Sequence, residues 1–202
     1  NVWTMPLLLQ VDKTTVNKFG VGERIVLKNI DGNAHSFLDV SEIFNSDRSK
    51  IAQKWFGTDS LRHPGVKRFL EAGDQFVAGE VTLINRLPSN YRKYELRPAQ
   101  TRTLFAEKKW RIVVGFHSRN PPHGAHRFIQ IDALKKTNAD GLYISPVIGP
   151  KKSDDFLPGP ILNSYQLLLD DRQYPKDKVL LGSFTTYSRY SGPREAVFTA
   201  LC

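Results

Sequence analysis

The chain has 202 residues, 40% of them hydrophobic and 11% aromatic, so it can bury one large core or two small ones. Its longest apolar runs fall far short of the roughly 20 residues that a membrane-spanning helix needs, and no secretory signal is visible. The only cysteine, Cys202, excludes an internal disulfide and a cysteine-based metal site. We therefore expect a cytoplasmic protein that does not cross a membrane. Because the sequence starts at Asn1 rather than Met, we also expect a fragment.

The net charge of +9 is unevenly distributed. Residues 1–98 carry 14 basic and 11 acidic side chains, and residues 99–202 carry 15 and 9. This surplus suits anionic ligands such as nucleotides and oxyanions, and it would also suit nucleic acid. However, the basic residues are scattered in ones and twos instead of clustering with stacking aromatics. Nucleic acid is therefore the less favoured partner.

The first half of the chain is predicted to form short strands and turns. Alternating apolar residues predict strands over 24–28, 34–40 and 75–84, and the Asp31-Gly32 pair between the first two is typical of a hairpin. A helix is predicted over 47–55. These elements predict a small β-rich module.

Residues 87–98 contain two prolines, show no periodicity and are predicted to be a linker. The pattern of predicted elements changes after them. We place a β-rich domain over 1–95 and a second domain over 96–202. In the second domain strands and helices alternate, which predicts an α/β fold with a parallel, doubly wound sheet whose ligands bind at the carboxyl ends of the strands. We expect the sheet to be unfinished where the sequence stops. The predicted strands are 111–116, 141–145 and 178–184, and the predicted helices are 125–134, 159–169 and one opening at Pro193.

The segment 116–126, Phe-His-Ser-Arg-Asn-Pro-Pro-His-Gly-Ala-His, holds the densest group of polar side chains. It lies between the first predicted strand and its helix. Asn120 is expected to cap that helix and Pro121 to occupy its first position. A spacing of three residues would place His123 and His126 on one helix face, beside free backbone amides that attract a phosphate. The pattern predicts an anion site.

Each of these residues also has an ordinary structural interpretation. Asn120 alone could be a helix cap without a ligand, and either histidine alone could be a packed or surface residue. A zinc pair is disfavoured because the segment lacks the glutamate, the four-residue spacing and the third ligand of the metalloprotease motif. Arg119 could be a surface residue, but at a strand end its guanidinium group can donate two hydrogen bonds to an oxyanion.

The run from Arg119 to His126 resembles the Arg-Asn-Pro-x-His-x-x-His part of the motif of the ATP sulfurylase family. The similarity extends over essentially the whole chain, and the ordered set of segments is far more specific than a lone His-x-x-His. The other matching segments are residues 3–6, 56–59, 63–66, 96–102, 139–142, 174–175 and 189–196.

The resemblance implies a PUA-like β-rich domain followed by a Rossmann-like nucleotidylyltransferase domain, which this chain would contain only in part. It implies sulfate activation in sulfate assimilation, in which MgATP and sulfate give adenosine 5′-phosphosulfate and pyrophosphate. It implies Mg²⁺ bound to ATP and no metal bound by the protein itself. Members of the family often form homo-oligomers.

The resemblance also implies roles for individual residues. The catalytic stretch would be Ser118, Arg119 and Asn120, and sulfate would be bound by His117 and Arg119. For Arg194, an ATP-binding role and an ordinary surface position in the first turn of its helix are equally good interpretations. The implied ATP-binding residues are His117, Ser118, Arg119, Asn120, His123, His126 and Arg194.

Two departures from the family pattern leave alternatives open. His117 stands where the family has glutamine, and an imidazolium there would bind an oxyanion more strongly at low pH. The family's Gly-Arg-Asp-His-Ala-Gly segment is absent, so this chain alone is expected to be inactive. One alternative is an adenylyltransferase with another oxyanion acceptor. The other is a non-catalytic protein that binds RNA through its PUA-like domain.

Overall fold

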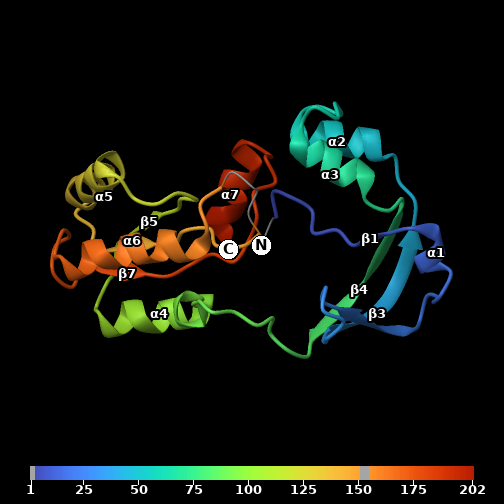
Figure 1. Cartoon of the computed structure of the whole chain (residues 1–202), viewed down its shortest axis with the longest axis horizontal. Helices are drawn as coiled ribbons and strands as arrows, with labels where there is room; N and C mark the ends of the chain where they lie inside the picture. The colour runs from blue at the N-terminus through green and yellow to red at the C-terminus, as the bar shows by residue number, and fades with distance from the viewer. Residues whose placement is uncertain (1–2, 151–154) are drawn as a thin grey trace. The chain divides into compact units, whose positions relative to one another are not determined.

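A computed structural model describes residues 3–150 and 155–202, and the chain divides into two compact units. One unit contains residues 1–89 together with the returning segment 189–201, and the other contains residues 90–188 with Cys202. Figure 1 follows the chain from its N-terminus to its C-terminus. Within the described ranges, no helix is both long and apolar enough to cross a lipid bilayer.

The first unit is built on a four-stranded antiparallel sheet with strand order β1-β4-β3-β2. The predicted hairpin joins β2 to β3, and the Asn29 side-chain carbonyl accepts hydrogen bonds from the amides of Asp31 and Asn33. Gly32 adopts a φ of 82°, which glycine tolerates without steric cost. The elements are β1 (Gln10–Val11), α1 (Lys13–Val16), β2 (Arg24–Lys28), β3 (Ala34–Phe44), β4 (Gln75–Leu83) and, in the returning segment, α7 (Pro193–Leu201).

Two helices, α2 (Arg48–Phe56) and α3 (Pro64–Glu71), also belong to this unit. The Asp47 side chain caps α2 by accepting a hydrogen bond from the Lys50 amide at 3.0 Å. The sequence predicted α2 but not α3. The unit has two clusters of buried apolar side chains, one formed by Ala52, Val66, Phe69 and Phe76 and one formed by Leu38, Val40 and Val77.

His63 joins the start of α3 to the returning segment. Its Nδ1 accepts a hydrogen bond from the Val66 amide at 3.2 Å, which caps α3. Its Nε2 lies 3.0 Å from the Tyr190 carbonyl oxygen and donates to it, since a carbonyl only accepts. The two chain segments approach so closely that a Cβ atom at Gly65 would lie 2.2 Å from the Arg189 carbonyl oxygen. His63 therefore links the start of α3 to residues 189–190 through hydrogen bonds at both ring nitrogens.

We expect His63→Ala to lower the free energy of unfolding by about 2 kcal/mol, because it removes a helix cap and a second, partly buried hydrogen bond. His63→Asn is the matched control, because asparagine is a good N-cap but is too short to reach Tyr190 as well. It should recover part of the loss. The measurement is the urea midpoint of unfolding. Equal midpoints for the wild type and His63→Ala would contradict the stabilising role of these two hydrogen bonds.

The second unit contains a three-stranded parallel sheet with strand order β5-β6-β7. Figure 1 shows α4 and α5 on opposite sides of this sheet. Parallel strands need crossover connections, which α5 and α6 provide. The elements are the 3-10 helix η1 (Arg92–Tyr94), α4 (Pro98–Glu107), β5 (Val113–Phe116), α5 (Gly124–Lys136), β6 (Gly141–Ile144), α6 (Pro158–Asp170) and β7 (Val179–Leu181).

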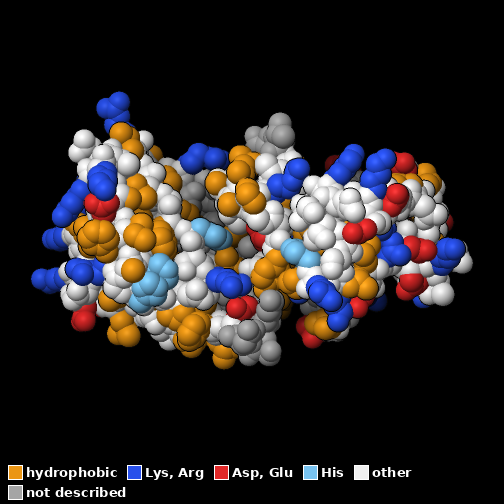
Figure 2. Space-filling model, turned by 90° about the horizontal axis from the view of Figure 1, so that it is seen from above, with side chains coloured by type: hydrophobic (Ala, Val, Ile, Leu, Met, Phe, Trp, Pro, Cys, Tyr) orange, Lys and Arg blue, Asp and Glu red, His pale blue; other side chains and the backbone are white. Residues whose placement is uncertain are grey.

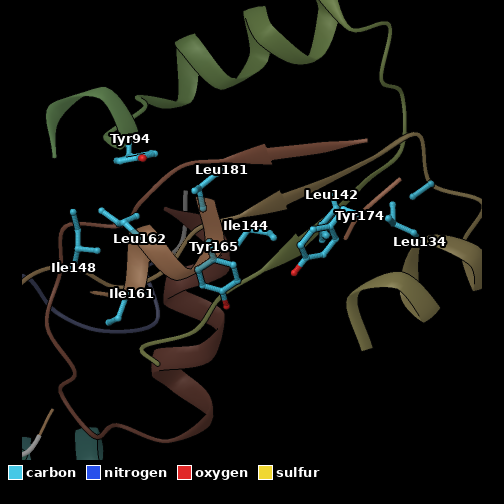
Figure 3. Packing of buried hydrophobic residues seen from close by; sticks show 11 residues of the cluster. Tyr94, Leu134, Leu142, Ile144, Ile148, Ile161, Leu162, Tyr165, Tyr174 and Leu181 are labelled. Atoms are coloured by element: carbon cyan, nitrogen blue, oxygen red, sulfur yellow. The ribbon is translucent and has the colours of Figure 1, made fainter. Parts of the chain in front are cut away.

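The core of the second unit lies between the sheet and α6 and α5. Figure 3 shows its side chains converging from the strands and helices. The cluster comprises Tyr94, Leu134, Ala139, Leu142, Ile144, Ile148, Ile161, Leu162, Tyr165, Tyr174 and Leu181.

The predicted fold class, a β-rich module followed by an α/β unit with a parallel sheet, is confirmed. Some details differ from the prediction. Part of the segment expected to be a linker is packed, because Glu95 is buried and pairs with Arg92 at 2.7 Å. The third strand of the parallel sheet is shorter than predicted, since regular pairing ends at Leu181 and resumes as an isolated bridge between Val147 and Phe184.

Candidate anion-binding site at the carboxyl end of the parallel sheet

Backbone hydrogen bonds hold the segment 116–126 in place at the carboxyl end of the sheet. The Ser145 amide donates to the Phe116 carbonyl at 2.9 Å, and the Val147 amide donates to the Ser118 carbonyl at 2.7 Å. The pairing between the first and second strands thus continues beyond their regular ends. The start of the loop is therefore an extension of the sheet, at the edge where parallel α/β proteins bind ligands.

The predicted cap of this helix, Asn120 with Pro121 at the first position, is wrong. α5 begins at Gly124, and its N-cap is His123, whose φ of −136° and ψ of 175° are extended. Asn120 and Pro121 each precede a proline, and the pyrrolidine ring disfavours the helical conformation in the residue before it. Asn120 therefore does not cap α5, and its amide instead donates to the Ser118 hydroxyl at 3.1 Å.

The N-terminus of α5 offers backbone donors. The first hydrogen bond of the helix runs from the Arg127 amide to the His123 carbonyl at 3.1 Å, so the amides of residues 124–126 have no partner within the helix. His123, the N-cap, makes no side-chain capping bond. These amides and the positive end of the helix dipole favour an anion at this position.

His123 and His126 lie together at this helix start, as their spacing predicts. Their rings stack with centroids 3.8 Å apart and planes inclined by 26°, and Phe116 packs edge-on against His126. Burial lowers the pKa of His126, and the neighbouring His123 lowers it further, while the Pro121 carbonyl opposes the fall. Nδ1 of His126 is buried without a hydrogen-bond partner among the described residues. This nitrogen is a polar group that a ligand could satisfy.

The lowered pKa of His126 predicts a pH-dependent stability. The unfolded chain binds the imidazole proton near pH 6.5 and the folded chain only at lower pH. The stabilising contribution is therefore complete above about pH 6.5 and is lost as the pH falls toward the lowered pKa.

Between about pH 7.5 and 5, the wild type should lose more unfolding free energy than His126→Asn. Denaturant unfolding at each pH tests this. His117→Asn, which alters an exposed imidazole on the same loop, is the control, and parallel pH profiles of the wild type and His126→Asn would contradict the prediction.

Arg119 projects from the loop with 47% of its side chain exposed. One guanidinium nitrogen lies 4.0 Å from Oδ1 of Asp155, which is beyond direct hydrogen-bonding distance. Because nearly half of the Arg119 side chain is exposed, an anion from solvent can reach its guanidinium group. Sequence reasoning missed Asp155, because nothing in its local sequence distinguishes it from a surface carboxylate.

The remaining predicted residues are distributed over both units. His117 is exposed and meets the Phe184 ring edge-on at 5.4 Å. Ser118 is half-buried, whereas Asn120 is exposed. Arg194 is exposed on α7, in the unit that contains residues 1–89, and its carbonyl accepts a hydrogen bond from Thr4. The structure thus brings together six of the seven predicted ATP-binding residues within the loop and its helix start.

A protein-bound metal finds no ready site in the described part of the chain. Among these residues, no group of three or more His, Cys, Asp or Glu side chains is arranged to hold an ion. A Mg²⁺ ion that arrives with ATP would instead take its ligands from phosphate oxygens and water, as Mg²⁺ commonly does.

The basic side chains are dispersed over the face of the molecule that Figure 2 displays. The Lys and Arg side chains of the described residues stand there singly or in small groups, with acidic and hydrophobic side chains between them. Proteins that bind nucleic acid through its phosphates usually present a basic patch or stripe.

A parallel sheet whose loop leads into a helix N-terminus is an arrangement in which α/β proteins commonly bind nucleotides. Comparison with known families makes the assignment specific. The sequence model of the ATP-sulfurylase family matches residues 92–202, and that of a PUA-like domain matches residues 1–86. The chain belongs to the ATP-sulfurylase family.

Curated relatives match the chain over its whole length. A sulfate adenylyltransferase of Symbiobacterium thermophilum is 39% identical over 201 residues, covering 100% of this chain and 50% of the relative. One from Pyrococcus abyssi is 39% identical and covers 98% of this chain and 51% of the relative. A protein of Sorangium cellulosum named as a probable bifunctional SAT/APS kinase is 38% identical, and 34% of it is covered. The chain thus spans about half the length of the first two relatives.

A solved structure has the same fold. It is that of a protein named as a hexameric APS kinase from Thiobacillus denitrificans, and it matches 98% of this chain with a TM-score of 0.73 at 18% identity. The match covers 35% of that structure's chain. At this identity the likeness establishes the fold.

Proposed function

We propose that this protein, at its full natural length, is a sulfate adenylyltransferase that transfers AMP from MgATP to sulfate. The observation that carries the proposal is the geometry of residues 117–126, which lead from the carboxyl end of the sheet to the N-terminal amides of α5 that have no partner within the helix. Relatives named for this activity are 39% identical to the chain, which supports the same assignment. The products would be adenosine 5′-phosphosulfate and pyrophosphate.

The reaction needs positioning and charge neutralisation more than proton transfer. A sulfate oxygen attacks the α-phosphorus, a new phosphorus–oxygen bond forms, and the bond to the β-phosphate bridging oxygen breaks, releasing pyrophosphate. Sulfate has no proton to lose at neutral pH, so no general base is required. The barrier arises from bringing a dianion against an anionic phosphoryl group, and fixed cationic and amide donors lower it.

Each predicted residue has a role that fits its place in the loop. Arg119 would lie between sulfate and the α-phosphoryl group and neutralise the charge that both bring. Ser118 and Asn120 would donate hydrogen bonds to the reacting oxygens. His123 and His126, beside the helix amides, would contact the ATP phosphates. Arg194, in the other unit, remains a proposed ATP contact.

His117 is the proposed sulfate contact that differs from the family pattern. Its imidazole is exposed, and the edge-on contact with Phe184 restricts the orientation of the ring. A second acceptor oxyanion is the alternative that this residue supports. Comparing sulfate with selenate and molybdate in a pyrophosphate-release assay would distinguish the two, because an enzyme tuned to another acceptor would release pyrophosphate faster with it.

We also propose the domain division predicted from the sequence, with a PUA-like domain over 1–95 and the catalytic domain over 96–202. The family matches support two domains, with the change between residues 86 and 92, a few residues before the predicted boundary. They differ from the compact units over the C-terminal segment, because residues 189–201 group with the first unit although the ATP-sulfurylase match includes them. Homo-oligomers and a cytoplasmic location stay predictions.

The proposal is tested by pyrophosphate release from MgATP. The full-length protein should release pyrophosphate only when sulfate is added, and the rate should saturate with both substrates. Release that does not depend on any oxyanion would indicate ATP hydrolysis instead. Salt-dependent RNA binding without pyrophosphate release would favour the non-catalytic alternative.

A further inference from the structure

A polar group lies inside the apolar core beneath the anion-binding loop. Gln130 has 0% of its surface exposed although it is an amide, and it lies one turn beyond His126 on the same face of α5. The Tyr174 hydroxyl donates a hydrogen bond to its Oε1 at 2.6 Å. Burial, with a further contribution from the neighbouring Tyr165, raises the pKa of Tyr174 to about 12. Figure 3 shows both tyrosines within the cluster.

Two atoms of this group are buried without a hydrogen-bond partner among the described residues. They are the Tyr165 hydroxyl and Nε2 of Gln130. Phe116, two residues before Ser118, packs against the buried cluster that contains Tyr165. Burial raises the pKa of Tyr165, and interactions of its hydroxyl with Ser118 and Gln130 oppose the rise. A buried polar atom without a partner costs about 1–3 kcal/mol. Such groups are rare in folded proteins and call for an explanation.

Ser118 is the link between this buried group and the loop. Its hydroxyl oxygen accepts from the Asn120 amide at 3.1 Å, and its carbonyl accepts from the Val147 amide at 2.7 Å. The hydroxyl therefore already shapes the turn that carries Arg119. The backbone of Ser118 is anchored by Val147, and Phe116, two residues earlier, packs against the cluster that contains Tyr165.

We propose that Tyr165 is a positioning residue for the anion-binding loop and acts through Ser118. When a nucleotide is bound, the Tyr165 hydroxyl donates to Oγ of Ser118, and the Ser118 hydroxyl donates to a phosphate oxygen. Gln130, held by Tyr174, keeps the Tyr165 hydroxyl beside Ser118. This inference rests on the proposed function, since it assigns a support to the same site. The unsatisfied hydroxyl is then a stability cost retained for activity.

The test compares Tyr165→Phe with the wild type in the full-length protein. Tyr165→Phe removes a hydroxyl that has no partner in the unliganded state, so the melting temperature should stay unchanged or rise. The kcat for pyrophosphate release should fall about tenfold, while KM for ATP changes less than about twofold, because misplacing a loop donor weakens transition-state contacts most. A role in core packing alone would leave kcat unchanged, and that result would overturn the proposal. A lower melting temperature with an unchanged kcat would overturn it too.

Tyr94→Phe is the matched control. Tyr94 belongs to the same cluster, and its hydroxyl lies near the Gln166 side chain at 3.5 Å. Figure 3 shows the Tyr165 hydroxyl pointing away from Tyr94. Tyr94→Phe should leave kcat unchanged, and a tenfold fall in this variant would show that any tyrosine lost from the core lowers activity.

A double-mutant cycle tests the link to Ser118. Tyr165→Phe should have no further effect on kcat in a Ser118→Ala background, because the tyrosine acts through that hydroxyl. Independent, multiplying effects would overturn the proposed link.

Hydrogen exchange separates this inference from the proposed function. MgATP should protect the amides of residues 117–120 in the wild type and in Tyr94→Phe, and protection should be lost in Tyr165→Phe. A wild type that shows this protection without turnover would contradict sulfate activation but support the positioning role. Equal protection in all three proteins would overturn the positioning role.

Discussion

Replacing Arg119 by alanine should lower kcat/KM of the full-length protein by about 10³-fold with little change in the melting temperature. Removing one preorganised donor to a developing anion commonly costs about 10²–10³ in rate, and cationic arginines in phosphoryl transfer contribute at least as much. The side chain is 47% exposed and its ion pair with Asp155 spans 4.0 Å, so its loss removes little packing. Steady-state pyrophosphate release and thermal unfolding measure the two effects.

Two further variants make this result specific. Arg119→Lys keeps the charge but loses the bidentate hydrogen bonding of the guanidinium group, so it should recover only part of the activity. Arg111→Ala removes an exposed arginine just before β5, at the opposite end of that strand, and should leave kcat/KM unchanged. An Arg119→Ala enzyme with more than about a tenth of the wild-type rate would contradict the role assigned to this residue.

The second large effect is expected at the paired histidines. His126→Asn and His123→Asn should each raise KM for ATP about 10- to 100-fold, because a hydrogen bond to a charged phosphate is worth about 1.5–3 kcal/mol. KM for sulfate should change by less than about twofold, since both rings lie at the helix start, where we propose that the ATP phosphates bind.

The control for the histidine variants is His35→Asn, which changes an imidazole in the antiparallel sheet of the other unit. It should leave both KM values unchanged. If His126→Asn raised KM for sulfate and not for ATP, the assignment of substrates along the loop would be reversed.

The amino-acid sequence predicted those parts of the fold that depend on local chemistry. The Asp31-Gly32 turn occurs where it was predicted, and α2 begins within one residue of its predicted start, where the Asp47 side chain caps it. α3 and α4 were missed although Pro64 and Pro98 occupy favourable first positions. Their N-caps, His63 and Arg97, are not residues that usually mark a helix start.

The candidate site was predictable only where it is continuous in sequence. Residues 117–126 could be recognised together because they follow one another along the chain. The cap of α5 was misplaced because Pro122 disfavours the helical conformation at Pro121, so the helix cannot begin directly after Asn120. Asp155 comes from another segment and Gln130 and Tyr165 from the buried faces of helices, so no local sequence pattern connects them with the loop.

The most direct test of the central claim runs the reaction in reverse. The full-length protein, supplied with adenosine 5′-phosphosulfate and magnesium pyrophosphate, should form ATP, and omitting either substrate should abolish the signal. Arg119→Ala should reduce the ATP signal about 10³-fold. A folded protein that binds ATP and yet forms none from these two substrates would contradict the assignment of sulfate activation.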